Sequence, residues 1–218
     1  MLTGYRRAFS LLELLVTLVL ISILAVLGFQ AGSRVLSRAD QADSLACLRN
    51  LGQAMLLYGG DHQQSLPGPL WPGQMLLYDA NREGRLVREV APYLEVEPRD
   101  LPYLVTRLIP RAYRRAVPAE KLPSTRIYVM NTAIEVQGKE RAPFGDLRTD
   151  PQTPTMRQSQ LRNLSAEDRW MMSEADQKHP DVSTAPWRNN TPREPVHQGR
   201  RAVMDFDGAI RLEGAEPQ

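Results

Sequence analysis

The chain has 218 residues, a formal net charge of +2 at neutral pH and a single cysteine, Cys47. This length suits one membrane anchor and one domain of ordinary size. Because Arg6 and Arg7 supply two positive charges, the rest of the chain is neutral overall and lacks the basic field typical of proteins that bind nucleic acid. One cysteine excludes an intrachain disulfide framework, and we expect Cys47 to be a small packing residue in a helix.

The N-terminal segment carries the clearest pattern. After the arginine pair at residues 6–7, Phe9 begins an apolar run in which Glu13 is the only charge before Arg34. At about 1.5 Å per residue, the uncharged run 14–33 spans about 30 Å of helix, the thickness of a bilayer's hydrocarbon core. We predict a single membrane span, with the N-terminus cytoplasmic and the chain after Arg34 outside the cytoplasm.

A cleaved signal peptide is the alternative for this segment. It would have the same charged start, and the small residues late in the run would permit cleavage: Ala25, Gly28, Ala31 and Gly32. The run is longer than the apolar region of a signal peptide, so the sequence favours a retained anchor.

Glu13 is the unusual residue of the apolar run. An ionised carboxylate in hydrocarbon costs at least about 2.5 kcal/mol, so it rarely occurs there without a partner. If the chain were cut between Ala8 and Phe9, the new α-amino group of a neighbouring chain would supply a cation for it. Alternatively, Glu13 lies near the lipid headgroups, where its cost is small, and position alone does not separate the two interpretations.

Residues 7–16, Arg-Ala-Phe-Ser-Leu-Leu-Glu-Leu-Leu-Val, resemble the type IV prepilin N-terminal motif that type IV pilins and type II secretion pseudopilins share. The resemblance implies that prepilin peptidase cleaves between Ala8 and Phe9, that Phe9 is then methylated at its amino group, and that Glu13 guides docking in a fibre. The family usually has glycine where this chain has Ala8, and alanine is small enough to be tolerated there.

Beyond the apolar run, the helix is predicted to continue. All 17 prolines follow residue 66, so residues 1–58 read as one unbroken helix, and Gly59-Gly60 supplies a stop signal. Within 34–60, apolar residues recur every three or four positions, which indicates an amphipathic helix with one stripe to bury. The stripe consists of Ala39, Ala42, Leu45, Leu48, Leu51, Met55 and Tyr58.

The remaining residues, 61–218, are expected to form one extracytoplasmic domain. Residues 61–123 are proline-rich, so we predict irregular structure with helical turns at 75–78 and 86–90 and with Trp71 and Tyr93 as core anchors. Runs rich in β-branched and aromatic residues predict strands, and Asp207-Gly208 predicts a hairpin turn between the last two strands. The predicted strands are 126–131, 169–174, 201–206 and 209–212, separated by long polar loops at 138–165 and 176–199.

The predicted fold is therefore α+β and pilin-like, with a long N-terminal membrane-spanning helix packed on a small antiparallel sheet with long loops. Its parts are a leader peptide (1–8), a transmembrane helix (9–33), the amphipathic continuation (34–60) and the domain (61–218). The order of Ile127–Asn131, Trp170–Glu174, His197-Gln198-Gly199 and Val203–Gly208 also resembles a pseudopilin-like subfamily of planctomycetes and verrucomicrobia. A Cys-Pro pair common there is Leu122-Pro123 here.

No catalytic pattern is visible, so we expect a protein that is not an enzyme and has no cofactor. The three histidines, His62, His179 and His197, do not lie at metal-ligand spacing, and His197 is assigned a structural hydrogen bond near the hairpin. Calcium is the one alternative, because carboxylates gather near the predicted sheet: Glu174, Asp176, Asp205 and Asp207. Gly28 and Gly32 form an isolated small-x-x-x-small pair.

These patterns favour a structural subunit, a pseudopilin or minor pilin of a type II secretion pseudopilus or type IV pilus. Its expected partners are prepilin peptidase, other pilin or pseudopilin subunits, the inner-membrane assembly platform and the lipid bilayer, with no nucleic acid. It would wait in the bacterial inner membrane with its domain in the periplasm and then join the fibre. The alternative is a membrane-anchored extracytoplasmic ligand-binding module that uses residues 176–199, with Trp187, as its contact surface.

Overall fold

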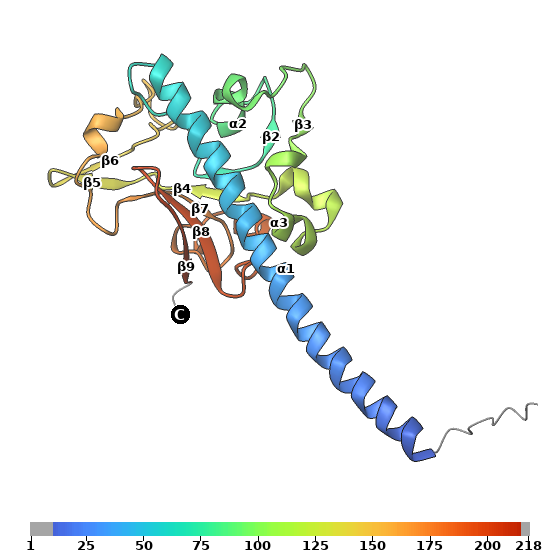
Figure 1. The fold of residues 1–218 in the computed structure, drawn as a ribbon. Helices are drawn as coiled ribbons and strands as arrows, with labels where there is room; N and C mark the ends of the chain where they lie inside the picture. The colour runs from blue at the N-terminus through green and yellow to red at the C-terminus, as the bar shows by residue number, and fades with distance from the viewer. Residues whose placement is uncertain (1–10, 215–218) are drawn as a thin grey trace, which may run out of the picture. The chain divides into compact units, whose positions relative to one another are not determined.

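The computed structural model describes residues 11–214, apart from the side chains of residues 30 and 31. The first element is helix α1 (Leu11–Asp61), shown in blue to cyan in Figure 1. The chain divides into two compact units between Ala39 and Asp40, so that α1 contributes to both. Within the described residues, α1 is the helix that is long and apolar enough to cross a membrane, by length and composition.

In the described part of the N-terminal unit, the apolar side chains are exposed rather than packed against other elements. Side chains from Leu11 to Phe29 are exposed, and Leu11 and Phe29 are exposed by 83% and 80%. The hydroxyls in this stretch are satisfied by the helix itself, since Thr17 donates to the Leu14 carbonyl and Ser22 to the Leu18 carbonyl, both at 2.8 Å. Such a helix needs no further polar partner for these two side chains in an apolar solvent.

The predicted helix stop at Gly59-Gly60 is wrong, because α1 continues through both glycines to Asp61. The turn comes later, where Gln63 and Gln64 have positive φ values of 54° and 64°, and the Gln64 amide closes the end by donating to the Gly59 carbonyl at 2.7 Å. Instead, Gly59 allows the side chain of Gln158 to lie close to the helix backbone. A Cβ there would lie 2.9 Å from Nε2 of Gln158.

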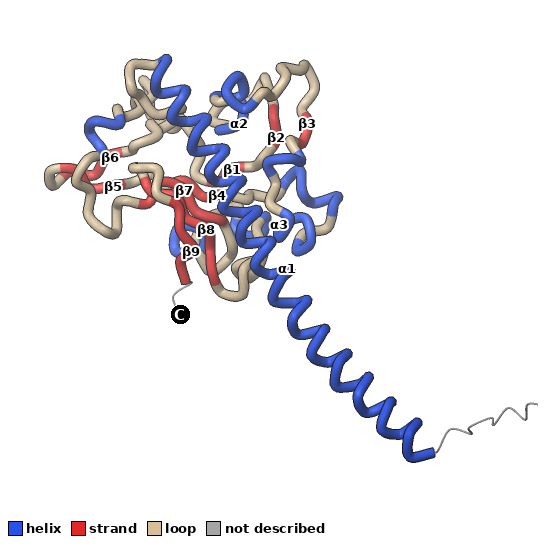
Figure 2. Tube along the Cα trace, viewed as in Figure 1, coloured by secondary structure: helices blue, strands red, loops and turns tan. Residues whose placement is uncertain are grey.

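The C-terminal unit is built on a fully antiparallel sheet, which in the described part of the chain has five strands in the order β1-β4-β7-β8-β9 (Figure 2). The strands are β1 (Gly73–Gln74), β4 (Tyr128–Met130), β7 (Trp170–Glu174), β8 (Arg200–Asp205) and β9 (Ile210–Gly214). The four predicted strands are β4, β7, β8 and β9, and the predicted turn at Asp207-Gly208 joins the last two. The α+β, pilin-like fold is confirmed.

Two small two-stranded antiparallel pairs and short helices fill the segments between these strands. They are β2 (Leu77–Tyr78) with β3 (Tyr103–Leu104), β5 (Ile134–Val136) with β6 (Lys139–Arg141), and the helices α2 (Leu86–Glu89), α3 (Arg111–Ala116) and α4 (Pro180–Ser183). Single 3₁₀ segments are η1 (Ala91–Leu94), η2 (Thr106–Leu108), η3 (Ala119–Ser124), η4 (Gln158–Leu161) and η5 (Arg188–Asn190).

Several predictions for these connecting segments are corrected. Residues 77–78 form β2 rather than part of a helical turn, whereas the turn predicted at 86–90 is α2. Trp71 is not a core anchor, since it is 39% exposed, and Tyr93 is half-buried with its hydroxyl donating to Asp61 at 2.8 Å. The predicted loop 138–165 contains β6, because Gln137 and Gly138 both have positive φ and close a two-residue turn after β5.

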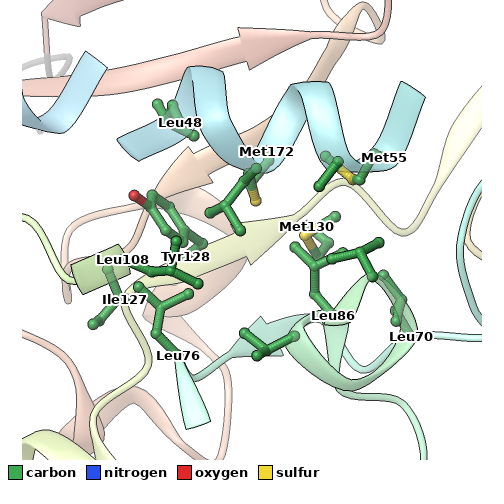
Figure 3. Packing of buried hydrophobic residues seen from close by; sticks show 14 of the residues in the cluster. Leu48, Met55, Leu70, Leu76, Leu86, Leu108, Ile127, Tyr128, Met130 and Met172 are labelled. Atoms are coloured by element: carbon green, nitrogen blue, oxygen red, sulfur yellow. The ribbon is translucent and has the colours of Figure 1, made fainter. Parts of the chain in front are cut away.

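The main core lies between the sheet and residues 44–59 of α1. Figure 3 shows Leu48 and Met55 of α1 directed toward Met172, Tyr128 and Met130 of the sheet. Because side chains alternate along a strand, Val129 faces the other side, where it packs with Ala175 and Val182. Strand β4 is buried on both faces, which explains its uninterrupted apolar sequence.

The buried stripe of α1 begins later than predicted. Ala42 is exposed and Leu45 only half-buried, while Ser44, Cys47, Gly52 and Ala54 join the leucines and Met55 in the interior. The prediction followed apolar residues, but small residues let the helix approach the sheet closely. A Cβ on Gly52 would lie 2.5 Å from Sδ of Met204 in β8.

Candidate functional site

The processing positions, Ala8 and Phe9, lie outside the described residues. Glu13 is described: it lies in the first turn of α1, and its side chain is exposed.

Glu13 stands alone in an apolar surface. Among residues 11–33 it is the only charged residue, and its neighbours on the helix are exposed leucines, with Leu12 at 70% and Leu14 at 57%. Monomeric soluble proteins rarely expose apolar surface of this extent, so this surface is of the kind covered by lipid or by another protein. In either surrounding the carboxylate is the one strongly polar group to be accommodated.

In the C-terminal unit, two acidic residues of α1 bind helix α3. Asp43 accepts a hydrogen bond from the Arg111 amide at 2.7 Å and lies 3.7 Å from Nε of the same arginine, at the start of α3. Asp40 forms an ion pair with Arg115 in the last turn of α3. These two contacts attach one edge of α1 to α3.

A buried polar cluster links α1 to the sheet. Nε2 of His197 lies 2.8 Å from Oγ of Ser44 in α1 and 3.3 Å from Oε1 of Glu174 in β7, and the Ala202 amide of β8 donates to Oε2 of Glu174 at 2.8 Å. All three side chains are buried, at 0–2% exposure. The structural role predicted for His197 is thus observed, although its partners are Ser44 and Glu174.

The geometry of this cluster differs from that of a hydrolytic triad. In a triad the base contacts the nucleophile through one ring nitrogen and the orienting carboxylate through the other. Here serine and glutamate share Nε2, and the serine is inaccessible at 0% exposure. The cluster fits a structural link better than an acyl-transfer site.

The four carboxylates considered for calcium engage separate partners. Glu174 contacts His197, Asp176 binds Arg201 through two hydrogen bonds of 2.5 and 2.9 Å, and Asp205 pairs with Arg211. Asp207 accepts from the Ala209 amide at 2.9 Å within the turn. Within residues 11–214, no three His, Cys, Asp or Glu residues form a group that could hold a metal ion.

Cys47 is a packing residue, as predicted. It is 6% exposed, and burial, reinforced by the negative charge of Asp43, raises the pKa of its thiol to about 12. The thiol is therefore protonated at neutral pH and unreactive. Gly28 and Gly32 have open space around them, with no atom within 4 Å of a Cβ built at either position.

Sequence reasoning did not identify Ser44 or Glu174 as partners of His197. One signal was available for the serine, because Ser44 lies in phase with Leu48, Leu51 and Met55 on the stripe predicted to be buried. A polar residue at such a position requires a hydrogen-bond partner. Its partner comes from a loop 153 residues later, which no local pattern indicates.

A comparison with known families finds one match. The family model described as prokaryotic N-terminal methylation motif matches residues 4–29, which include Ala8, Phe9 and Glu13. No curated protein and no solved structure matches the chain. The motif supports a type IV prepilin-like family, and the long apolar helix joined to an antiparallel sheet is consistent with the pilin-like fold.

Proposed function

We propose that the protein is a structural subunit, a pseudopilin or minor pilin, of a type II secretion pseudopilus or a type IV pilus. The observation that carries the proposal is the methylation motif at residues 4–29, placed directly on an apolar helix with exposed side chains. A motif for N-terminal processing and a helix that needs covering are both required of a subunit that first resides in a membrane and then in a fibre.

In this proposal prepilin peptidase cuts between Ala8 and Phe9, and the exposed amine of Phe9 becomes methylated. The N-terminus lies in the cytoplasm, and the domain lies in the periplasm beyond the inner membrane. An assembly platform then extracts the subunit, and its apolar helix packs among those of other subunits. Glu13 pairs with the N-terminal amine of an adjacent subunit, which removes the cost of an isolated charge in an apolar surrounding.

The first test is the N-terminal mass of the protein recovered from its native membrane. A chain that begins at methylated Phe9 is the expected result. An intact Met1 would contradict processing and leave the helix as a plain anchor. A chain that begins after Ala25 or Ala31 would identify an ordinary secreted protein.

The second test separates assembly from insertion. Glu13→Ala should insert into the membrane normally but lose most incorporation into the fibre, measured by the amount of the variant in sheared fibres relative to membranes. Glu13→Asp keeps the charge and should retain part of the incorporation, and Thr17→Ala is a control one turn away. Wild-type incorporation of Glu13→Ala would remove the proposed role of the carboxylate.

The second candidate is a membrane-anchored extracytoplasmic module that binds a ligand through residues 176–199. It is favoured by Trp187, a half-buried aromatic residue in this segment that borders a surface cavity. N-terminal processing and fibre incorporation distinguish the two functions. The finer resemblance to the planctomycete and verrucomicrobial pseudopilin-like subfamily is part of the first proposal and rests on the order of the strand segments.

A further inference from the structure

A cavity of about 470 Å³ lies beside the short edge strand β1 of the sheet. Two indole rings border it, from Trp71 before β1 and from Trp187 just ahead of η5. Three arginines complete the charged part of its wall: Arg82, Arg85 and Arg126. This volume lies within the range of about 300–1,000 Å³ typical of small-ligand sites.

The chain is built to hold the two indoles at this place. A Cβ on Gly73 would lie 2.9 Å from the Trp187 ring, and one on Gly84 would lie 2.5 Å from Trp71, so a larger residue at either position would displace an indole. The buried Gln74 fixes the loop between them, since its side chain donates to the carbonyls of Trp71 and Gly84, at 2.5 and 3.1 Å. The walls are therefore positioned by buried contacts.

The arginines lack acidic partners, although Nη1 of Arg126 donates to the Ser124 carbonyl at 3.3 Å and its guanidinium lies over the Trp187 ring, 5.7 Å from the ring centroid. Arg85 is 3% exposed, yet its Nε has no hydrogen-bond partner and its Nη1 reaches only the Gly73 carbonyl at 3.4 Å. Within residues 11–214, none of Arg82, Arg85 and Arg126 forms an ion pair. A buried cation with unfilled donors is costly, which points to a ligand that supplies the missing acceptor.

The electrostatics of the cavity agree with this arrangement. Burial, together with the like charges of Arg82 and Arg126, lowers the pKa of Arg85 to about 10. Burial and the charge of Arg82 also lower the pKa of Arg126. Arg85 remains protonated at neutral pH, so an anion that entered the cavity would relieve its repulsion with the neighbouring arginines.

The side chains that line the cavity restrict the chemical class of the ligand. Guanidinium groups bind carboxylates and sulfates through paired hydrogen bonds. Indole rings offer flat apolar surface, of which Trp71 is the more open at 39% exposure. Asn81 and Glu83 on the rim can bond neutral hydroxyls, and Glu83 disfavours a dianion. An oxyanion, a ring with an apolar face and several hydroxyls occur together in an acidic sugar.

We propose that this cavity binds a saccharide unit that bears a single carboxylate or sulfate group, with the anion on the three arginines and the sugar ring against the indoles. The site consists of residues of the C-terminal unit and includes none of the residues of the methylation motif, so ligand binding there does not depend on fibre assembly. It would give either a fibre subunit or an anchored module a means of binding acidic polysaccharide.

The test is a titration of the full chain in detergent micelles, followed by tryptophan fluorescence, because two of the three tryptophans line the cavity. Glucuronate and glucose 6-sulfate should produce a saturable change, glucose should produce none, and inorganic sulfate should bind at least tenfold more weakly. Added sodium chloride should weaken the binding of the acidic sugars.

Variants test the assignment to this cavity. Arg82→Gln and Arg126→Gln, at exposed and half-buried positions, should each weaken binding of acidic sugars at least tenfold, while Arg88→Gln, the same charge change on α2 outside the cavity, should leave it unchanged. Arg85→Gln should abolish binding, with near-UV circular dichroism as the check on folding. Equal binding of glucose, binding of adenosine monophosphate instead of the acidic sugars, or wild-type affinity in both Arg82→Gln and Arg126→Gln would overturn the proposal.

Discussion

The two halves of α1 share one helical backbone but differ in whether their apolar side chains are exposed or buried. Residues 11–29 present apolar side chains that no described part of the chain covers, whereas Leu48, Leu51 and Met55 are buried by the sheet. The first half has a single charge, Glu13, and the second has charges at several positions along its exposed side. The two halves therefore have the same secondary structure but different sources of burial. The apolar side chains of the first half need a lipid or protein surrounding, whereas those of the second half are buried by the protein's own domain.

The largest expected effect comes from the buried Leu51 of the second half, and the exposed Leu20 of the first half is its control. Leu51→Ala should lower the free energy of unfolding of the domain by about 4 kcal/mol, since Leu51 is fully buried and its loss leaves a cavity. Leu20→Ala, at a 55% exposed position, should leave that free energy unchanged. Denaturant unfolding of the full chain in micelles, followed by tryptophan fluorescence, measures both, and similar losses would break the distinction between the halves.

The buried cluster of His197, Ser44 and Glu174 gives the second-largest expected change in the free energy of unfolding. His197→Ala removes a partner from both Ser44 and Glu174 and leaves a buried carboxylate with one fewer hydrogen bond, so it should cost about 3 kcal/mol. Ser44→Ala should cost only about 1 kcal/mol, because His197 keeps its contact with Glu174. The same denaturant titration measures both variants. If His197→Ala lowers the free energy of unfolding no more than Ser44→Ala does, the buried carboxylate of Glu174 does not need its contact with His197.

The dependence of stability on pH should come from the domain, because the described part of the first half of α1 contains no histidine. Burial, with the nearby charge of Arg201, lowers the pKa of His179 from 6.5 to about 4, and its Nδ1 accepts from the Asp181 amide at 3.2 Å. As the pH falls below 6.5, the unfolded chain binds a proton that the folded chain excludes until about pH 4, so stability falls in this window.

The expected loss from His179 is about 2.5 kcal/mol at pH 4.5. His179→Asn retains an acceptor for the Asp181 amide without a titrating ring. The difference in unfolding free energy between wild type and this variant should therefore shift against the wild type between pH 6.5 and 4. A constant difference across that range would mean that His179 is not kept neutral by the fold.

The smallest effect compares two glycines of α1. Alanine favours a helix over glycine by about 1 kcal/mol, and Gly28 has open space, so Gly28→Ala should not destabilise the isolated protein. At Gly52 the added methyl would meet Sδ of the buried Met204 at 2.5 Å, and overpacking should outweigh the propensity gain for a net loss of about 1 kcal/mol. Thermal unfolding in micelles compares the pair, and a stabilised Gly52→Ala would mean that Met204 repacks freely.

Local patterns predicted the elements that local physics determines. The apolar run predicted α1, and the β-branched and aromatic runs predicted β4, β7, β8 and β9, with Asp207-Gly208 between the last two. The two-residue strand β1 lies in the segment predicted to be irregular, because so short a strand has no periodicity. It exists through its pairing with β4, which is distant in the sequence.

The same distinction holds for the sites. Glu13 was identified because a charge in an apolar run is visible in the sequence alone. The arginine cavity was not, because Arg82 and Arg126 are brought together only by the pairing of β1 with β4, and Gly73 and Gly84 reveal their role only through the indoles they accommodate. Partners separated by tens of residues leave no local signal.

The edge strands of the sheet affect whether neighbouring copies of the domain can pair their sheets. One edge strand, β1, has only two residues, and the other, β9, carries Arg211 and Glu213 along its length. Short or charged edges discourage strand addition from a neighbouring molecule. Domains concentrated in two dimensions on a bilayer, or stacked along a filament, can thus collide often without joining their sheets into an aggregate, which leaves the N-terminal helix to determine the order of any assembly.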